Sequence, residues 1–132
     1  MLTLDFETFS QVNLKTRGLA AYAQNAEVLL CAYHLNGTTH LWDVTTGVPM
    51  PADLFEALHD PETQVLAHNA QFEKTILRHC LDISVPWARW EDTMVVALTC
   101  GLPAGMNALC SALRLSQADS KLDDGKRLIN LL

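Results

Sequence analysis

The chain has 132 residues, of which 49% are hydrophobic and 18% charged, and its formal net charge is −6. This length predicts a single domain over residues 1–132, and the composition excludes wholesale disorder. The excess of acidic residues argues against a protein that binds nucleic acid by charge alone, but not against an enzyme whose acids hold metal ions. The sequence has no signal peptide and no apolar run long enough to span a membrane, which predicts a cytoplasmic protein without membrane contact.

Alternation and turn signals predict that the chain begins with three strands. Residues 1–8 alternate between apolar and polar side chains, which indicates a half-buried strand. The apolar run at 28–35 is typical of a strand covered on both faces. Asn36-Gly37 is a strong hairpin signal, because both residues tolerate positive φ, and 38–44 is expected to return antiparallel.

Helical spacing and chain breakers predict the other elements. The order of three strands, a helix, a strand and then helices predicts an α/β fold of ribonuclease-H-like type. Its mixed sheet is antiparallel in the first three strands and then parallel, with helices packed on it. In the first half of the chain we expect a helical piece at 18–23 and a helix opened by Pro51, with Leu54, Phe55 and Leu58 as its apolar stripe. A strand at 64–67, a helix at 71–81 and an extended connector at 87–90 follow. The last elements expected are a helix capped by Asp92 or Thr93 and ended by Gly101, a helix at 107–115 and an amphipathic helix at 126–132.

Two features leave alternatives open. The four cysteines lack metal-ligand spacing and are expected to be buried free thiols, rather than a disulfide or zinc site. The apolar stripe of 126–132 ends without a cap. Either this helix packs on its own domain, or the chain is incomplete at its C-terminus and another part of a longer protein covers the stripe.

Asp5 and Glu7 are the first candidate metal ligands. At positions i and i+2 of a strand, their side chains emerge on one face about 7 Å apart. A pair of divalent cations would offset their repulsion and would align an attacking water with a phosphodiester. The alternative is an exposed strand face, which tolerates acids.

Glu73 is the third candidate ligand. It lies in line with Ile76, Leu77 and Cys80, the core-facing stripe of its helix. A lone buried carboxylate costs several kcal/mol unless it is paired or metal-bound, so its place on this stripe suggests a ligand. The alternative is an edge position at which the acid reaches solvent and is stabilised by the helix dipole.

The segment before Glu73 turns from a strand end into a helix, as a chain does beneath a ligand. Asn69 is expected to cap this helix and can also contact substrate. His68 is either a ligand or a half-buried histidine.

At this point the sequence resembles the DnaQ-like, or DEDD, 3′–5′ exonucleases, above all the proofreading domain of bacteriophage-type family A DNA polymerases. The likeness runs over nearly all of the chain. The blocks that carry it are Leu4-Asp5-Phe6-Glu7-Thr8, the Gly-Leu-x-x-Tyr-Ala element at 18–23, His68-Asn69-Ala70-Gln71-Phe72-Glu73 and Glu91-Asp92-Thr93-Met94.

The resemblance implies two Mg²⁺ or Mn²⁺ ions and metal-assisted hydrolysis of a DNA 3′ end. One ion would lower the pKa of a water, and the other would stabilise the leaving 3′ oxygen. Asp5 would bridge both ions, Glu7 would hold one and orient the 3′ end, and Glu73 would hold the other through water. The substrate-binding residues implied are Thr8, Phe9, His68, Asn69 and Phe72, and Lys15, Arg17, Lys74 and Arg78 either contact phosphates or are solvated surface.

The chain also departs from the family. Glu73 stands where the family most often has Asp, and Asp92 is expected mainly to cap a helix. The third motif, a Tyr or His four or five residues before a last Asp, is missing, since the late acids Asp119, Asp123 and Asp124 have no such partner.

Three interpretations follow. The chain is an exonuclease domain of a polymerase that was cut before its last motif, with the polymerase module or another partner on its C-terminal helix. Alternatively, it is an inert exonuclease-like fold that binds DNA ends or a partner protein. The third is an unrelated α/β domain with a fortuitous acidic strand.

Overall fold

The computed structural model describes residues 1–119. They fall into two compact units, Met1–Asp92 and a second that begins at Thr93. The expected helix at 126–132 and the acids Asp123 and Asp124 lie outside the described residues. Among the described residues, none of the helices is both long enough and apolar enough to cross a membrane.

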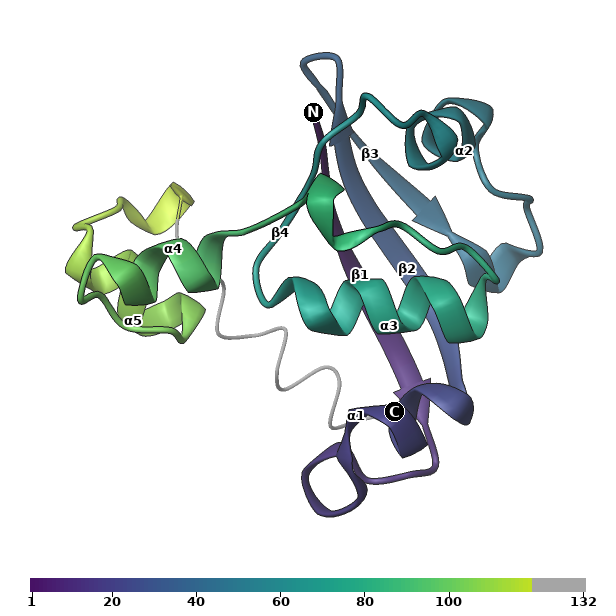
Figure 1. Cartoon of the computed structure of the whole chain (residues 1–132), viewed down its shortest axis with the longest axis horizontal. Helices are drawn as coiled ribbons and strands as arrows, with labels where there is room; N and C mark the ends of the chain where they lie inside the picture. Colours follow the sequence, from purple (N-terminus) through teal and green to yellow (C-terminus); the bar gives the residue numbers. More distant parts are fainter. Residues whose placement is uncertain (120–132) are drawn as a thin grey trace. The chain divides into compact units, whose positions relative to one another are not determined.

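The first unit is built on a five-stranded mixed sheet with the order β3-β2-β1-β4-β5 (Figure 1). β1 pairs antiparallel with β2, and β2 pairs antiparallel with β3. β4 pairs parallel with both β1 and β5. This arrangement confirms the predicted ribonuclease-H-like α/β fold. The strands are β1 (Leu2–Ser10), β2 (Ala26–Leu35), β3 (Thr38–Asp43), β4 (Val65–Ala67) and β5 (Trp90–Asp92).

Helices flank and follow these strands. Figure 1 shows α3 running across one face of β1 and β2. The α-helices of the first unit are α1 (Leu14–Gln24), α2 (Ala52–His59) and α3 (Ala70–Cys80), and those of the second are α4 (Thr93–Thr99) and α5 (Met106–Ala112). Three short 3₁₀ turns complete the described chain, η1 (Val44–Thr46), η2 (Trp87–Arg89) and η3 (Gln117–Asp119).

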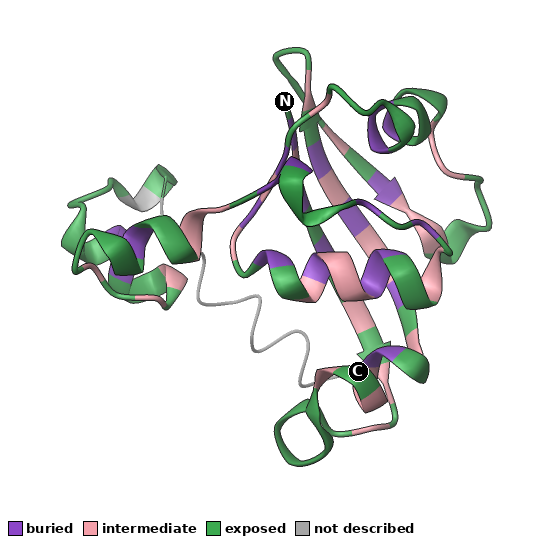
Figure 2. Cartoon of the chain, in the orientation of Figure 1, coloured by how far each residue is buried: buried purple, intermediate pink, exposed green. Residues whose placement is uncertain are grey.

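One face of β1 supplies the core. Leu2, Leu4 and Phe6 are buried, whereas Asp5 and Glu7 between and beyond them are exposed, as the alternation predicts (Figure 2). Cross-strand partners share a face, so the buried side of β2 is the side on which Phe6 pairs with Cys31. The other buried side chains of this core are Val28, Tyr33, Trp42, Leu54, Leu58, Val65, Ile76, Leu77, Ile83, Val85 and Trp90, with several alanines.

The hairpin between β2 and β3 forms where the sequence places it. Asn36 has φ of 52° and Gly37 has φ of 80°. Two successive residues with positive φ match the twist of the flanking strands, so this turn sets their register. Leu35 then pairs with Thr38.

Three expectations about local structure are wrong. Phe55 does not belong to the buried stripe of α2, because it is 51% exposed and stacks on His59 with ring centroids 4.0 Å apart. The expected connector at 87–90 is a 3₁₀ turn that leads into β5, which the sequence did not predict. All four cysteines are free, but Cys100 is exposed and Cys80 is half-buried.

Arg89 is a buried cation that ties α2 to the start of β5. Its guanidinium donates to the carbonyls of Leu58 at 2.8 Å, Ala57 at 2.9 Å and Thr63 at 2.8 Å. Ala57 and Leu58 belong to the last turn of α2, where helix carbonyls lack intrahelical partners. The arginine therefore closes the C-terminal end of α2 and holds it beside the parallel strands.

Candidate metal centre

The candidate site lies at an edge of β1 that β4 leaves open. Within β1, only Leu2 and Thr3 pair with β4, so among the described residues no strand pairs with β1 on that side from Leu4 onward. The chain leaves β4 at Ala67 and enters α3 at Ala70. The first turn of α3 is thereby placed beside the stretch of β1 that carries the two acids.

Glu73 fills this position with a buried carboxylate. Its side chain is only 3% exposed, which confirms that it lies on the core-facing side of α3 and not at a solvated edge. One of its oxygens, Oε2, has no hydrogen-bond partner among the described residues. An orphaned carboxylate oxygen inside a protein is costly unless a proton or a cation satisfies it.

The pKa shifts of Glu73 and Cys31 show that other carboxylates lie near Glu73. Burial in the first place, together with repulsion from Asp5 and Asp92, raises the pKa of Glu73 from 4.5 to about 8. Hydrogen bonds from the backbone N–H groups of Glu73 itself and Phe6 act in the opposite direction. The pKa of the Cys31 thiol rises to about 12, first through burial and then through the charges of Asp5 and Glu73. The fold therefore brings Asp5 and Asp92 close enough to Glu73 for their charges to act on it, and Asp5 and Glu73 also act on Cys31.

The donor chemistry of this neighbourhood suits a hard divalent cation. Carboxylate oxygens are the ligands that Mg²⁺ and Mn²⁺ prefer, and a cation would relieve both the repulsion and the orphaned Oε2. However, residues 1–119 contain no group of three His, Cys, Asp or Glu side chains close enough to hold a metal ion. The structure thus offers carboxylates of the right chemistry without a preformed cage that includes Glu7.

Asp92 has a role that the sequence did not reveal. Its Oδ1 accepts from the Asn69 N–H at 2.9 Å, and its Oδ2 accepts from the Ala70 N–H at 2.9 Å. It thus satisfies the exposed donors at the start of α3, 22 residues away. The expectation that Asn69 caps this helix with its side chain is wrong. Asn69 occupies the cap position in the left-handed region, with φ of 69°, and its side chain makes no capping bond.

Replacing Asp92 by alanine is expected to lower the free energy of unfolding by about 1–2 kcal/mol, because two helix-start donors lose their acceptor. Urea denaturation measures the change. Glu91→Ala, at the exposed neighbouring position, is the matched control and should change stability by less than half as much. Equal losses in the two variants would show that the bonds to α3 contribute nothing.

Tyr22 connects two of the predicted substrate residues. Its hydroxyl lies 2.8 Å from Oγ1 of Thr8, and its ring centroid is 6.1 Å from that of Phe72. Thr8 follows Glu7 on β1, and Phe72 precedes Glu73 on α3. Tyr22 therefore joins the two elements that carry the acids. The sequence holds this tyrosine in its Gly-Leu-x-x-Tyr-Ala element, but nothing in the spacing indicates what it contacts.

The other predicted substrate residues lie around these elements. Phe9 is 43% exposed near the end of β1. His68 is half-buried and Asn69 is exposed, both in the turn before α3. Asp119, a late acid of the sequence, lies in the second unit and accepts from Ser116 Oγ at 2.6 Å.

Comparison with known proteins gives one clear relative in sequence. The chain is 35% identical over 131 residues to the DNA polymerase of Bacillus phage SP02. The match covers 97% of this chain but only 20% of the polymerase. No protein-family model matches the chain.

Solved nucleases have a similar fold. NrnC of Brucella melitensis superposes with a TM-score of 0.66 and 17% identity, over 92% of this chain and 56% of that one. NrnC with bound Mg²⁺ gives 0.65 and 18% identity, over 95% of this chain and 61% of that one. The chain therefore has the ribonuclease-H-like fold of the DEDD exonucleases and is related in sequence to about a fifth of a phage DNA polymerase.

Proposed function

We propose that this chain is a metal-dependent 3′–5′ exonuclease domain that hydrolyses DNA from its 3′ end, as the proofreading part of a DNA polymerase. The observation that carries the proposal is the buried carboxylate of Glu73, orphaned at Oε2 and within the electrostatic reach of Asp5. A buried acid next to another acid has no structural benefit in itself, but it suits the binding of a cation. The kinship with a phage DNA polymerase and the fold shared with NrnC agree with this chemistry.

The proposed ligands of two Mg²⁺ or Mn²⁺ ions are Asp5, Glu7 and Glu73. When bound, such ions lower the pKa of a water and offset the charge that develops at a phosphodiester. Glu73 must lose its proton before it can serve as a ligand, because its pKa is about 8 in the metal-free chain. Asp5 is exposed on β1 and lies within electrostatic reach of Glu73, so the two carboxylates are proposed to share a cation.

The 3′ end of the DNA would lie along the residues of β1 and α3 that flank the proposed metal ligands. Thr8, Phe9 and Phe72 are proposed to contact the terminal nucleotide, with stacking on the exposed part of Phe9. His68 and Asn69, in the turn before α3, are proposed to contact its sugar and phosphate. Tyr22 keeps Thr8 in place through its hydroxyl.

The proposed setting is the cytoplasm of a bacterium or an infected cell, and the proposed partners are single-stranded DNA and the polymerase module. The chain spans 20% of the polymerase that it matches. A polymerase module would supply the primer end that a proofreading site removes.

A second function rests on a specific observation. Since residues 1–119 hold no preformed group of three ligands, an inert exonuclease-like module that binds DNA ends or a partner protein is the alternative. Incubating the chain with Mn²⁺ and a 5′-labelled single-stranded oligonucleotide separates the two. Stepwise shortening from the 3′ end with release of 5′-mononucleotides supports the exonuclease. An intact oligonucleotide, bound or unbound, contradicts it.

A further inference from the structure

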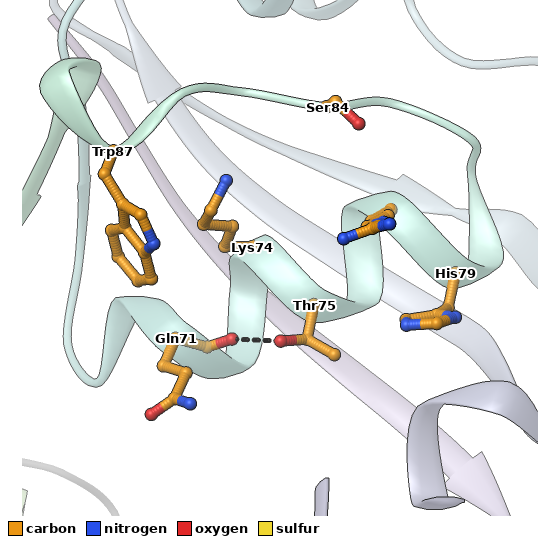
Figure 3. Close-up of a pocket in the computed structure, with 7 residues that line it drawn as sticks. Gln71, Lys74, Thr75, His79, Ser84 and Trp87 are labelled. Atoms are coloured by element: carbon orange, nitrogen blue, oxygen red, sulfur yellow. Dashed lines mark hydrogen bonds between the residues drawn. The ribbon is translucent and has the colours of Figure 1, made fainter. Parts of the chain in front are cut away.

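A basic hollow lies on α3, on the side of the helix away from its buried stripe. It has a volume of about 240 Å³ and is open to solvent. Figure 3 shows the side chains of α3 that line it, and the segment with Ser84 and Trp87 that borders it. Glu73 points to the core, whereas Lys74 and Arg78 follow on the outer side of the same helix. The hollow is therefore separate from the candidate metal centre, although one helix carries both.

The charge of this hollow is opposite to that of the chain. Lys74, Arg78 and His79 line it and no acidic side chain does, in a chain with 15 acids and nine Lys or Arg residues. Lys74 and Arg78 are four residues apart, a spacing at which like charges destabilise a helix. An anion bound at Arg78 would relieve that repulsion. The polar groups of Thr75 and Ser84 add further hydrogen-bonding capacity to the lining.

Trp87 gives the hollow a flat apolar wall. It is 57% exposed, which is high for a residue of this size. Lys74 holds it in place, because the lysine ammonium lies 5.1 Å from the centroid of the tryptophan ring and also donates to the carbonyl of Val85. The ring is thus fixed beside the basic groups instead of being folded into the core. Exposed aromatic rings next to cations are the groups on which nucleobases stack.

We infer that this hollow binds a phosphate-bearing nucleotide unit, with its phosphate on Arg78 and His79 and its base on Trp87. We take the nucleotide unit to be an internal nucleotide of the single-stranded DNA whose 3′ end lies at the metal centre. This choice rests on the proposed function. Gln71, in the first turn of α3 beside Phe72, lies at the end of the hollow nearest that centre. A free nucleoside monophosphate offers the same chemistry, and the experiment distinguishes the two sources.

The test is a binding experiment that needs no catalysis. Fluorescence anisotropy in EDTA measures the affinity of the chain for a 5′-labelled thymidine hexanucleotide. In a second arm, thymidine monophosphate is added as a competitor. Trp87→Leu is expected to weaken binding about tenfold through lost stacking. Arg78→Gln is expected to lower the slope of log affinity against log salt by about 0.7, the value for one phosphate contact on a single strand. Arg114→Gln removes an exposed arginine of the second unit, and should leave affinity and slope unchanged.

The outcomes are separate from those of the nuclease assay. All three positions are exposed, and thermal unfolding followed by circular dichroism checks that the variants are folded. Binding of the hexanucleotide by Trp87→Leu and Arg78→Gln with wild-type affinity and slope overturns the inference, even if the wild type degrades DNA. Weakened binding in both variants supports it, even if no DNA is degraded. Efficient competition by thymidine monophosphate at equal concentration would overturn the assignment of the hollow to a nucleotide within a DNA strand.

Discussion

Replacing Asp5 by asparagine is expected to reduce the release of mononucleotides from single-stranded DNA by at least about a thousandfold. A bound divalent ion contributes several kcal/mol of charge stabilisation in a hydrolytic transition state, and each 1.4 kcal/mol is tenfold in rate. Asparagine keeps the size of the side chain but loses the charge that attracts the ion. Asp5 is exposed on β1, so the loss should come without unfolding. Initial rates at saturating Mn²⁺ measure the effect.

Asp82→Asn is the matched control for this substitution. Asp82 is exposed and has φ of 54°, a conformation that asparagine adopts readily. The control should cleave at the wild-type rate. A residual activity of Asp5→Asn within tenfold of wild type would remove Asp5 from the metal centre.

Replacing Glu73 by glutamine is expected to stabilise the metal-free chain at pH 8 and to leave its stability at pH 5 nearly unchanged. Between pH 4.5 and about 8 the folded chain holds a proton on Glu73 that the unfolded chain has released. The unfolded state then binds fewer protons, so the free energy of unfolding falls as pH rises. The fall is about 1.4 kcal/mol for each pH unit, or at most about 4 kcal/mol between pH 5 and pH 8. Glutamine does not titrate and abolishes this dependence.

Urea denaturation in EDTA at several pH values measures the difference between the two proteins. Glu62→Gln, which removes an exposed carboxylate, should follow the wild-type curve. Adding Mn²⁺ at pH 8 should stabilise the wild type more than Glu73→Gln, because a ligand that binds only the folded state raises its stability. Parallel curves for wild type and Glu73→Gln would show that the carboxyl group of Glu73 titrates normally.

Much of the sheet was predictable because its signals are local. The alternation in β1 and the Asn36-Gly37 turn each depend on a few neighbouring residues. β5 was missed because it has only three residues, Trp90–Asp92, too few to show a period. Phe55 was placed in the core because helical spacing cannot tell a buried ring from one that stacks on the exposed His59.

At the candidate site, the burial of one proposed ligand was predictable from the sequence, but the arrangement of the acids was not. The burial of Glu73 follows from the spacing of the apolar residues on α3. Its nearness to Asp5 depends on how far β4 pairs along β1, which is a long-range property. The hydrogen bonds between Asp92 and the start of α3 also join residues more than 20 positions apart. The sequence offers Asn69 as a nearer helix cap, so it does not point to Asp92.

The short pairing of β4 has a consequence for how the chain associates with itself. A strand edge with open N–H and C=O groups is a template for pairing with another chain, and natural sheets guard such edges with inward-pointing charges or covering helices. At the open edge of β1, the first turn of α3 is such a covering helix, and the carboxyl group of Glu73 lies close to the backbone N–H of Phe6 there. The helix that carries an acid proposed to serve cleavage therefore also shields this edge of the sheet from pairing with another chain.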